Sequence, residues 1–434
     1  MAANRVLLAL LLLAAVKSLL WSVAIPPWRA PDEPQHFGYI EYLNREKSIP
    51  LDGQTYFYPD VFESLSRTNF AGITGSDRTD VDPQTRQLNP AAQHPPLYYL
   101  MVLPVYRAAA GAPIETQLYL VRVFGILISM ALIAVSWRFA RLVFPGASYL
   151  QIGVPLLMIF HPQFGFIAAA AMNDGLLALL FTLFLYQLVI FAQGDFSPRR
   201  AAVIGVITGL GMLTKSSFLI AYPVGFIVVA VLLVLKKGQR LRLLRAAALV
   251  LAVSFLICFW YYLRNYLELG VWQPTYKGER YRAGGWWDLL FHTAFRTDLV
   301  TSFLGNFSWL TIPLPAEAVF WFNRIAELSV LGLAATLALG WRRGRELLKP
   351  WLALLFVGVF MLFVLSAAYY ELQYSGTQGR YLFPADFAFW SLALAGLVGW
   401  MPPSWRPRAT VLVVSAAATF FVWSLYCEFV GRVT

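Results

Sequence analysis

The sequence predicts an all-α polytopic membrane protein, and three observations lead to this fold class. The chain of 434 residues is 59% hydrophobic and only 13% charged, whereas soluble proteins carry about 25% charged residues. Apolar runs of roughly 20 residues, the length that crosses a bilayer, recur from end to end. Basic residues gather in the short loops between these runs, where positive charge orients membrane spans. The net charge of +11 therefore does not indicate a nucleic-acid partner.

Two other kinds of chemistry lack support in the sequence. The two cysteines, Cys258 and Cys427, both lie in apolar runs and form no CxxC motif, so neither a disulfide framework nor a redox site is indicated. The chain contains no GxGxxG and no GxxxxGK[ST] motif. A water-soluble nucleotide donor would therefore have no recognisable binding loop.

The N-terminal apolar run is predicted to be an uncleaved span. Val6 to Val16 resembles the apolar part of a signal peptide, but Lys17 interrupts it and apolar residues continue to Ile25. We expect a single transmembrane domain over residues 1–434. Eleven spans are expected, near residues 5–25, 118–143, 148–169, 173–193, 200–214, 217–235, 245–268, 319–341, 351–370, 381–400 and 409–430.

Segment 95–110 decides the orientation of every later span. It is short for a span and contains Pro104, which disfavours a continuous crossing helix. If it does not cross and the N-terminus is inside, every basic loop cluster is cytoplasmic, as the positive-inside rule requires. We therefore place 95–110 as a helix in the outer interface. The clusters are Arg138 and Arg141; Arg199 and Arg200; Lys236, Lys237, Arg240, Arg242 and Arg245; Arg342, Arg343, Arg345 and Lys349; and Arg406 and Arg408.

Two large segments are then expected on the outer side, over 26–117 and 269–318. The first holds eleven of the 23 acidic residues. The second is rich in aromatic residues, which indicates a segment at the membrane interface. Its aromatic residues include Trp286, Trp287, Phe291 and Trp309.

Asp32 and Glu33 form an acid pair at the outer end of the first span, just before Pro34. Two carboxylates at a membrane boundary are costly unless they are solvated or used in chemistry. Pro34 suits the first turn of a helix predicted over 34–46, so either acid alone would serve as its cap. A cap needs one carboxylate rather than two, and the pair therefore favours a chemical role.

Further polar residues converge on the same outer face under this topology. They are His36, His94, Asn173, Asp174, Thr214, Lys215, Arg264, Asn265 and Arg380. The convergence indicates a site, because the topology was derived from loop charges alone.

Several of these residues also have a structural interpretation. Asn173-Asp174 is a common helix start, and a single lysine such as Lys215 often snorkels to the interface. Arg380 is able to pair with Glu371. His161, near the end of the third span, is better explained as a packed histidine than as a ligand.

The chemistry that these residue types support is group transfer. A carboxylate can take a proton from a hydroxyl, while Lys215 and Arg380 can hold a phosphate leaving group. An acidic and histidine-rich set would also suit a divalent metal, although no DxD motif lies near residue 32. The pattern neither requires nor excludes a metal. That set is Asp32, Glu33, His36, His94 and Asp174.

An ordered set of short stretches resembles the GT-C fold of membrane glycosyltransferases. The resemblance is to the bacterial branch related to protein O-mannosyltransferases and aminoarabinose transferases, and to a large group of bacterial membrane proteins with the same pattern. The stretches are Pro31-Asp32-Glu33-Pro34-Gln35-His36-Phe37, His94-Pro95-Pro96-Leu97-Tyr98-Tyr99, Met172-Asn173-Asp174-Gly175, Leu213-Thr214-Lys215, Tyr262-Leu263-Arg264-Asn265-Tyr266, Gly305-Asn306-Phe307 and Gln378-Gly379-Arg380-Tyr381-Leu382-Phe383-Pro384.

The resemblance implies roles for individual residues. It implies Asp32 as the catalytic base, with Glu33 the less favoured choice, and Asp174 as a second acid on the outer face. His94, Lys215 and Arg380 are implied as ligands of the lipid phosphate. Some relatives carry lysine where His94 stands, and a neutral histidine holds phosphate less strongly. His36, Asn173, Arg264 and Asn265 are expected around the substrates.

The function implied is inverting transfer of a sugar from a polyprenyl-phosphate donor to a glycan or lipid-linked acceptor. The site would face the periplasm of a bacterial inner membrane, with a cytoplasmic N-terminus. The alternative is a transporter or flippase for a lipid-linked or anionic substrate, which would place polar residues through the membrane interior. A third interpretation is a non-catalytic protein that binds a lipid-linked glycan. Asp32 and Lys215 together favour the enzyme.

Overall fold

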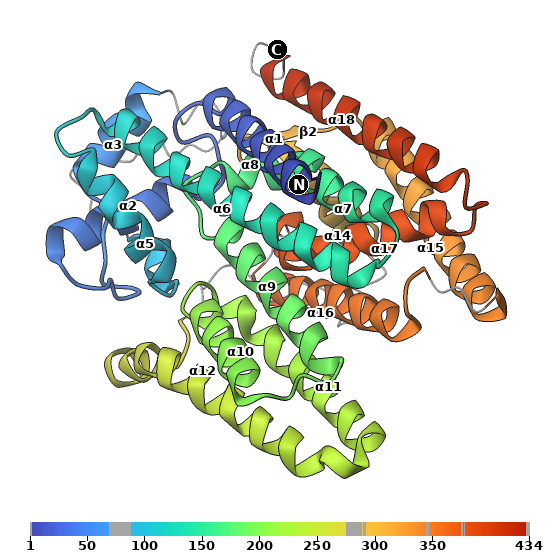
Figure 1. Ribbon diagram of the computed structural model, residues 1–434. Coiled ribbons are helices and arrows are strands. Elements are labelled where there is room, and N and C mark those ends of the chain that lie inside the picture. The colour runs from blue at the N-terminus through green and yellow to red at the C-terminus, as the bar shows by residue number, and fades with distance from the viewer. Residues whose placement is uncertain are drawn as a thin grey trace. The chain divides into compact units, whose positions relative to one another are not determined.

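The computed structural model describes residues 2–68, 88–274, 289, 292–343, 347–374, 376 and 378–430 (Figure 1). Trp286, Trp287, Phe291 and Arg345 lie outside the described residues. Nine described helices are long and apolar enough to cross a membrane, or ten if one bent pair counts as a span. The molecule is a multi-pass helical membrane protein, as the sequence predicts.

The chain divides into two compact units. The first comprises Met1–Pro31, Gly125–Ala170 and Gly278–Thr434, and the second comprises Asp32–Phe124 and Ala171–Lys277. Helix α6 (Ile114–Val143) passes from the second unit into the first at Gly125. Each unit is described by itself below.

The first unit contains most of the predicted spans. Its helices are α1 (Ala2–Ala24), the later part of α6, α7 (Ser148–Phe160), α8 (Pro162–Ala168), α14 (Thr293–Leu304), α15 (Ala316–Arg343), α16 (Pro350–Tyr374), α17 (Asp386–Gly399) and α18 (Arg406–Val430). A 3-10 helix, η5 (Gly379–Ala385), precedes α17. The short strands β1 (Asn306–Phe307) and β2 (Ile312–Pro313) pair antiparallel, with Asn306 opposite Pro313.

Backbone contact between glycines joins α15 and α17. A Cβ added to Gly332 would lie 2.2 Å from the carbonyl oxygen of Gly396, and a Cβ added to Gly396 would lie 2.1 Å from that of Ser329. The Ser329 hydroxyl donates a hydrogen bond of 2.7 Å to the carbonyl oxygen of Ala393. Small residues allow this approach between membrane helices, where close packing and interhelical hydrogen bonds hold helices together.

Helices α7 and α8 together occupy the predicted span 148–169, but they meet at an angle of 63°. The break falls at His161-Pro162. His161 is extended, with φ −67° and ψ 110°, because a residue before proline is driven away from the helical region. Two helices that meet at this angle therefore stand where the sequence predicts one span.

The second unit contains a helical bundle and most of segment 26–117, which the sequence predicts on the outer side. The bundle helices are α9 (Asp174–Ala192), α10 (Pro198–Met212), α11 (Ala221–Leu235) and α12 (Arg240–Leu269), with the 3-10 helices η3 (Ser216–Ile220) and η4 (Lys237–Gln239) between them. The outer segment forms α2 (Glu33–Glu46), α3 (Pro59–Arg67), η2 (Pro90–Gln93) and α5 (Leu97–Ala108). Helices at 34–46 and 95–110 are thus confirmed, while their place at the membrane surface stays a prediction.

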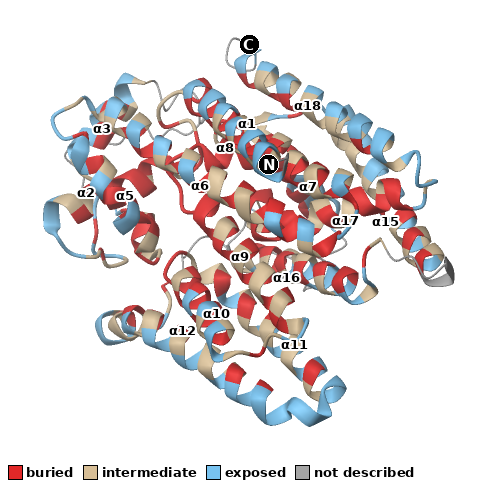
Figure 2. Cartoon of the chain, viewed as in Figure 1, coloured by how far each residue is buried: buried red, intermediate tan, exposed pale blue. Residues whose placement is uncertain are grey.

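Helix α10 lies close to the expected span 200–214. It has 15 residues, fewer than the about 20 that cross a bilayer. The expected number of eleven spans is therefore not confirmed. Much of α11 and α12 is exposed (Figure 2), including Leu256 at 77% and Leu267 at 72%. Exposed leucines at this density are typical of surfaces that face lipid.

Candidate functional site

Asp32 stands immediately before α2 in an uncommon backbone conformation. Its φ of 60° and ψ of 6° are left-handed, and its side chain makes no capping hydrogen bond to the helix. Left-handed backbone is rare outside glycine, although Asp and Asn tolerate it better than other residues. The Asp32 carbonyl oxygen accepts a hydrogen bond of 3.1 Å from the amide of His36. The half-buried side chain therefore follows a defined turn, and the cap-only interpretation loses support.

Glu33 is fully buried and held by hydrogen bonds from Arg122 and Ala171. Its Oε1 accepts from Arg122 Nε at 2.8 Å, and its Oε2 accepts from Arg122 Nη2 at 2.6 Å. The backbone amide of Ala171 donates to Oε1 at 3.1 Å. Both charged side chains are 0% exposed, and the guanidinium also lies 5.1 Å from the Tyr119 ring centre. These contacts give Glu33 an anchoring role and favour Asp32 as the base.

Asp174 and Lys215 form an ion pair in the same unit. Lys215 Nζ lies 2.7 Å from Asp174 Oδ1, and the two side chains are 12% and 2% exposed. Asp174 is the first residue of α9, and Lys215 follows α10. The neighbouring Asn173 donates from Nδ2 to the carbonyl oxygen of Thr214 at 3.1 Å. The predicted second acid and phosphate-binding lysine are therefore brought into direct contact.

Two histidines and two tyrosines stack between α2 and α5. The rings of His36 and His94 are 5.3 Å apart and nearly parallel, and Tyr39 and Tyr99 stack at 3.7 Å. His36 Nδ1 and the Tyr99 hydroxyl are 2.7 Å apart, and the Tyr39 hydroxyl donates to the His94 carbonyl oxygen at 3.3 Å. Burial raises the pKa of both tyrosines well above 10.0, so both hydroxyls keep their protons at neutral pH.

The C-terminal end of α12 holds two loops of segment 26–117 in place. Arg264 donates from Nη2 to the carbonyl oxygen of Ile49 at 2.6 Å and from Nη1 to that of Pro50 at 3.3 Å. Tyr261 donates to the carbonyl oxygen of Gln93 at 3.3 Å. Arg264 thus holds the loop after α2, and Tyr261 holds the backbone next to His94. Asn265 is buried, and its Nδ2 has no hydrogen-bond partner within the described part of the chain.

Arg380 belongs to the first unit and is 6% exposed. Backbone contact fixes the residue before it, because the Gly379 amide donates to the Ser302 hydroxyl at 2.7 Å. A Cβ on Gly379 would lie only 2.1 Å from the backbone nitrogen of Phe303. Glycine is therefore required beside Arg380. A shared phosphate between Arg380 and Lys215 stays a prediction.

The sequence of this chain matches one family model. The family model described as "Predicted membrane protein (DUF2142)" matches residues 16–388. The chain belongs to the DUF2142 family. No curated protein matches it by sequence.

Solved structures show the fold of this DUF2142 chain. ArnT from Cupriavidus metallidurans bound to undecaprenyl phosphate is similar with a TM-score of 0.53 at 16% identity, over 97% of this chain and 71% of ArnT. The Archaeoglobus fulgidus oligosaccharyltransferase in the apo form is similar with a TM-score of 0.53 at 13% identity, over 97% of this chain. The DUF2142 chain covers 56% of that enzyme. The fold is GT-C, as the ordered stretches indicate.

Sequence reasoning left Arg122 without a role. It lies inside the predicted span 118–143, and an arginine within a span is itself a signal of a buried partner or a functional site. Its partner Glu33 is 89 positions away, and no local pattern links the two. An arginine within a predicted span indicated a buried partner, but nothing in the sequence indicated that this partner is Glu33.

The first unit of this DUF2142 protein holds a second buried pair. His161 Nδ1 lies 3.0 Å from Asp386 Oδ1, and its Nε2 lies 2.7 Å from the carbonyl oxygen of Phe303. Both ring nitrogens therefore lie within hydrogen-bond distance of an oxygen atom. The rings of Phe164 and Trp390 also contact His161. His161 is thus a satisfied, packed histidine, as expected.

The divalent-metal interpretation finds no ligand cluster. Within the described part of the chain, no three His, Cys, Asp or Glu side chains lie together as metal ligands. The residues proposed for a metal are engaged elsewhere, with Glu33 on Arg122 and Asp174 on Lys215. Their observed contacts support an anchor and an ion pair.

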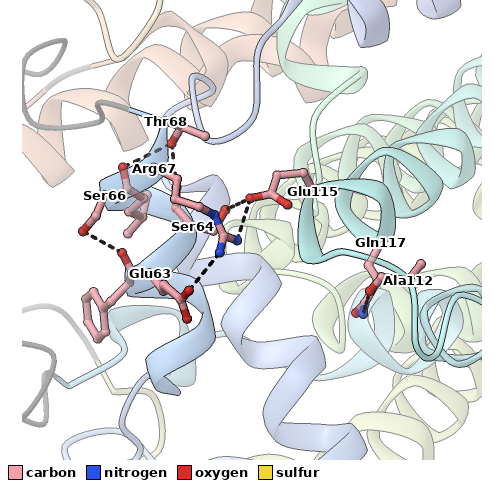
Figure 3. A network of polar contacts seen from close by, with 10 residues as sticks. Glu63, Ser64, Ser66, Arg67, Thr68, Ala112, Glu115 and Gln117 are labelled. Carbon is pink, nitrogen blue, oxygen red and sulfur yellow. Dashed lines mark hydrogen bonds and ion pairs between the residues drawn. The ribbon is translucent and has the colours of Figure 1, made fainter.

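Helix α3 is attached to the start of α6 by a polar network (Figure 3). Glu115 Oε1 accepts from the Ser64 hydroxyl at 2.6 Å and from Arg67 Nη2 at 3.0 Å. Arg67 also pairs with Glu63 at 3.0 Å. Because Glu115 precedes Arg122 by about two helical turns, this network fixes the part of α6 that carries Arg122.

Proposed function

We propose that this DUF2142 protein is an inverting glycosyltransferase. It moves a sugar from a polyprenyl-phosphate donor to a glycan or lipid-linked acceptor at the periplasmic face of a bacterial inner membrane. The observation that carries the proposal is the acid pair at the start of α2. Glu33 is fully engaged by Arg122 and Ala171, whereas Asp32 is half-buried at a left-handed turn. The GT-C fold supports the same reaction class.

The proposed reaction is a direct displacement at the anomeric carbon. Asp32 takes the proton of the acceptor hydroxyl as that oxygen forms its bond to the anomeric carbon. The bond between that carbon and the phosphate oxygen breaks, and polyprenyl phosphate leaves with the electron pair. A single displacement inverts the configuration of the sugar.

Cationic side chains would stabilise the leaving phosphate. Lys215 has three N–H donors, and one of them is directed to Asp174, which leaves two for phosphate oxygens. Arg380 and His94 are the further proposed ligands. ArnT, a protein of the same fold, has been solved with undecaprenyl phosphate bound, which supports a lipid phosphate as the donor group.

The remaining proposed substrate residues divide into two groups. Asn173 and Arg264 bond to backbone carbonyl oxygens of Thr214 and of Ile49, so they act on substrates by holding these loops. His36 and Asn265 are buried near the start of α2 and at the outer end of α12. Their proposed role is contact with the sugar or the acceptor.

The test is transfer in proteoliposomes with radiolabelled undecaprenyl-phosphate hexoses and pentoses as donors. Asp32→Asn should lower turnover by about 100-fold or more, because it removes the base. Its melting temperature and its binding of undecaprenyl phosphate should match the wild type, since Asn tolerates left-handed backbone.

Glu63→Gln is the matched control for loss of an outer carboxylate. Glu63 is 72% exposed, and the bonds from Ser64 and Arg67 to Glu115 do not involve its carboxylate, so the turnover of Glu63→Gln should be unchanged. Near wild-type turnover in Asp32→Asn would show that Asp32 is not the base. Movement of intact donor across the bilayer without release of sugar would favour a flippase instead.

A further inference from the structure

We propose that Arg122 is a positioning residue for Asp32, acting through Glu33. The inference rests on the proposed function, because it explains how the base is held. Arg122 binds the carboxylate of Glu33, the residue that follows Asp32. Its effect passes along the backbone from the anchored Glu33 to the residue before it.

The first step is the anchoring of Glu33. Arg122 grips both carboxylate oxygens, at 2.8 and 2.6 Å, and the Ala171 amide adds a third bond at 3.1 Å. A two-point contact between a planar guanidinium and a carboxylate fixes direction as well as distance. The contacts of the Glu33 side chain therefore restrain the Glu33 end of the peptide that joins it to Asp32.

The second step is the unusual backbone at Asp32. A left-handed residue other than glycine persists only where its surroundings determine it. On one side stands the anchored Glu33, and Pro34 follows with a φ set by its ring. The Asp32 carbonyl oxygen is held by the His36 amide at 3.1 Å. Without the Arg122 contact, the turn would lose its strongest restraint.

The contacts of α6 with α3 hold Arg122 itself in place. Helix α6 is fixed about two turns earlier by the bonds of Glu115 with Ser64 and Arg67 (Figure 3). Arg122 therefore projects from a helix whose first turns are bonded to α3 through Glu115. The position of Glu33, and hence of Asp32, is defined relative to that helix.

The fourth step connects the base to the predicted phosphate end. Ala171, which bonds Glu33, lies three residues before Asp174, which pairs with Lys215 at 2.7 Å. The amide of Leu97 also bonds the carbonyl oxygen of Leu213 at 2.9 Å. The clamp formed by Glu33, Arg122 and Ala171 thus sets the base relative to the segment that carries the lysine.

Stability alone does not account for this pair. A buried ion pair is often replaced by apolar side chains without loss of stability, although removal of one partner is strongly destabilising. A purely structural pair should therefore be dispensable when both charges are removed together. A positioning pair should not be, and the two roles predict different behaviour for the same double variant.

The experiment compares Arg122→Met, Glu33→Gln and the double variant Glu33→Gln/Arg122→Met. Each single variant leaves a buried charge unpaired, so both should melt at a lower temperature than the wild type. The double variant should recover the melting temperature. Its turnover should stay about 100-fold below the wild type, with the donor KM within about 3-fold, because a small misplacement of a catalytic group lowers kcat steeply.

Hydrogen–deuterium exchange supplies a readout that needs no sugar donor. In the double variant, amides of residues 32–37 should exchange faster than in the wild type, while α9 to α12 are unchanged. Arg122→Lys is a second variant for the case that the double variant fails to fold. It keeps the charge but lacks the two-point grip, so it should fold, exchange faster over 32–37 and lose turnover.

The results separate the two proposals. Wild-type turnover in a folded double variant or in Arg122→Lys would overturn the positioning role, and so would unchanged exchange over 32–37. Equal transfer by the wild type and Asp32→Asn would instead overturn the proposed function. In that case the exchange measurement still decides whether Arg122 holds the turn.

Discussion

The backbone at Asp32 and the chemistry proposed for its side chain favour the same residue type. Asp and Asn are the non-glycine residues that best tolerate a left-handed conformation, and only Asp is also able to accept a proton. Glu33 differs from Asp32 by one methylene and one position, yet its carboxylate is consumed by Arg122 and Ala171. The sequence left these two acids as alternatives, because the residues that engage Glu33 lie far from it in the chain.

Glu41 is a buried carboxylate that predicts a dependence of stability on pH. It is 1% exposed on α2 and pairs with Arg45 at 2.6 Å. Burial raises its pKa from 4.5 to about 7, although Arg45 opposes the shift and Asp60 adds to it. The folded protein keeps this proton at pH values where the unfolded chain has released it. The resulting stabilisation is complete below about pH 4.5 and is lost as the pH rises through 7.

Glu41→Gln should remove this dependence. Between pH 5 and pH 8 the wild type should lose up to about 3 kcal/mol of stability through this group, while the variant should not show that loss. Thermal unfolding in detergent at both pH values measures the difference, with Glu63→Gln as the control. Parallel pH profiles of the wild type and Glu41→Gln would contradict the assignment.

At the scale of elements, helix contacts through glycine leave no room for side chains. Gly396 on α17 faces the backbone of Ser329 on α15, where an added Cβ would lie 2.1 Å from a carbonyl oxygen. Gly358 on α16 has no atom within 4 Å of the same added Cβ among the described residues. The two glycines therefore form a matched pair for one substitution.

Gly396→Ala should destabilise the protein, because the two helices must separate to accept the methyl group. Gly358→Ala should be neutral or stabilising by up to about 1 kcal/mol, since alanine is the better helix former. Melting temperatures in detergent compare the two variants. An equal or higher melting temperature in Gly396→Ala would contradict the close contact of α15 and α17.

The elements that could be predicted from sequence share a local signal. Long apolar runs identified α1, α9, α11 and α16, and Pro34 marked the start of α2. The bend between α7 and α8 was signalled only by Pro162, and hydropathy does not distinguish a bent pair from one span. Helix α10, with 15 residues, lies in one of the apolar runs but is shorter than a span. Hydropathy therefore does not by itself show whether an apolar run of this length crosses the membrane.

At the scale of the whole molecule, the orientation is a prediction that rests on loop charges. With a cytoplasmic N-terminus, position 63 in the outer segment lies in the periplasm and position 237 between α11 and α12 lies in the cytoplasm. Glu63 and Lys237 are both exposed, so both positions suit labelling.

Glu63→Cys in intact cells should react with a membrane-impermeant maleimide, whereas Lys237→Cys should react only after lysis. The chain with its two native cysteines sets the background. Labelling of position 237 in intact cells would contradict this orientation and would indicate that the proposed site faces the cytoplasm.

The GT-C fold was within reach of the sequence because short motifs recur in a fixed order. The pairing of charges was not, because partners lie far apart in the chain. Asp174 and Lys215 are 41 positions apart, and His161 and Asp386 are 225 apart. Local patterns identify which charges a membrane segment must satisfy. They do not identify which distant residue satisfies them.

The hydrogen bond from Ala171 to Glu33 also sets an order of assembly during synthesis. The two residues are 138 positions apart, so the first outer loop is exported well before its last restraint exists. At a synthesis rate of roughly 5–20 residues per second, the delay is on the order of 10 s. A nascent chain that stops before residue 171 would carry the acid pair without its full restraint. The proposed activity would then appear late, after α9 has entered the membrane.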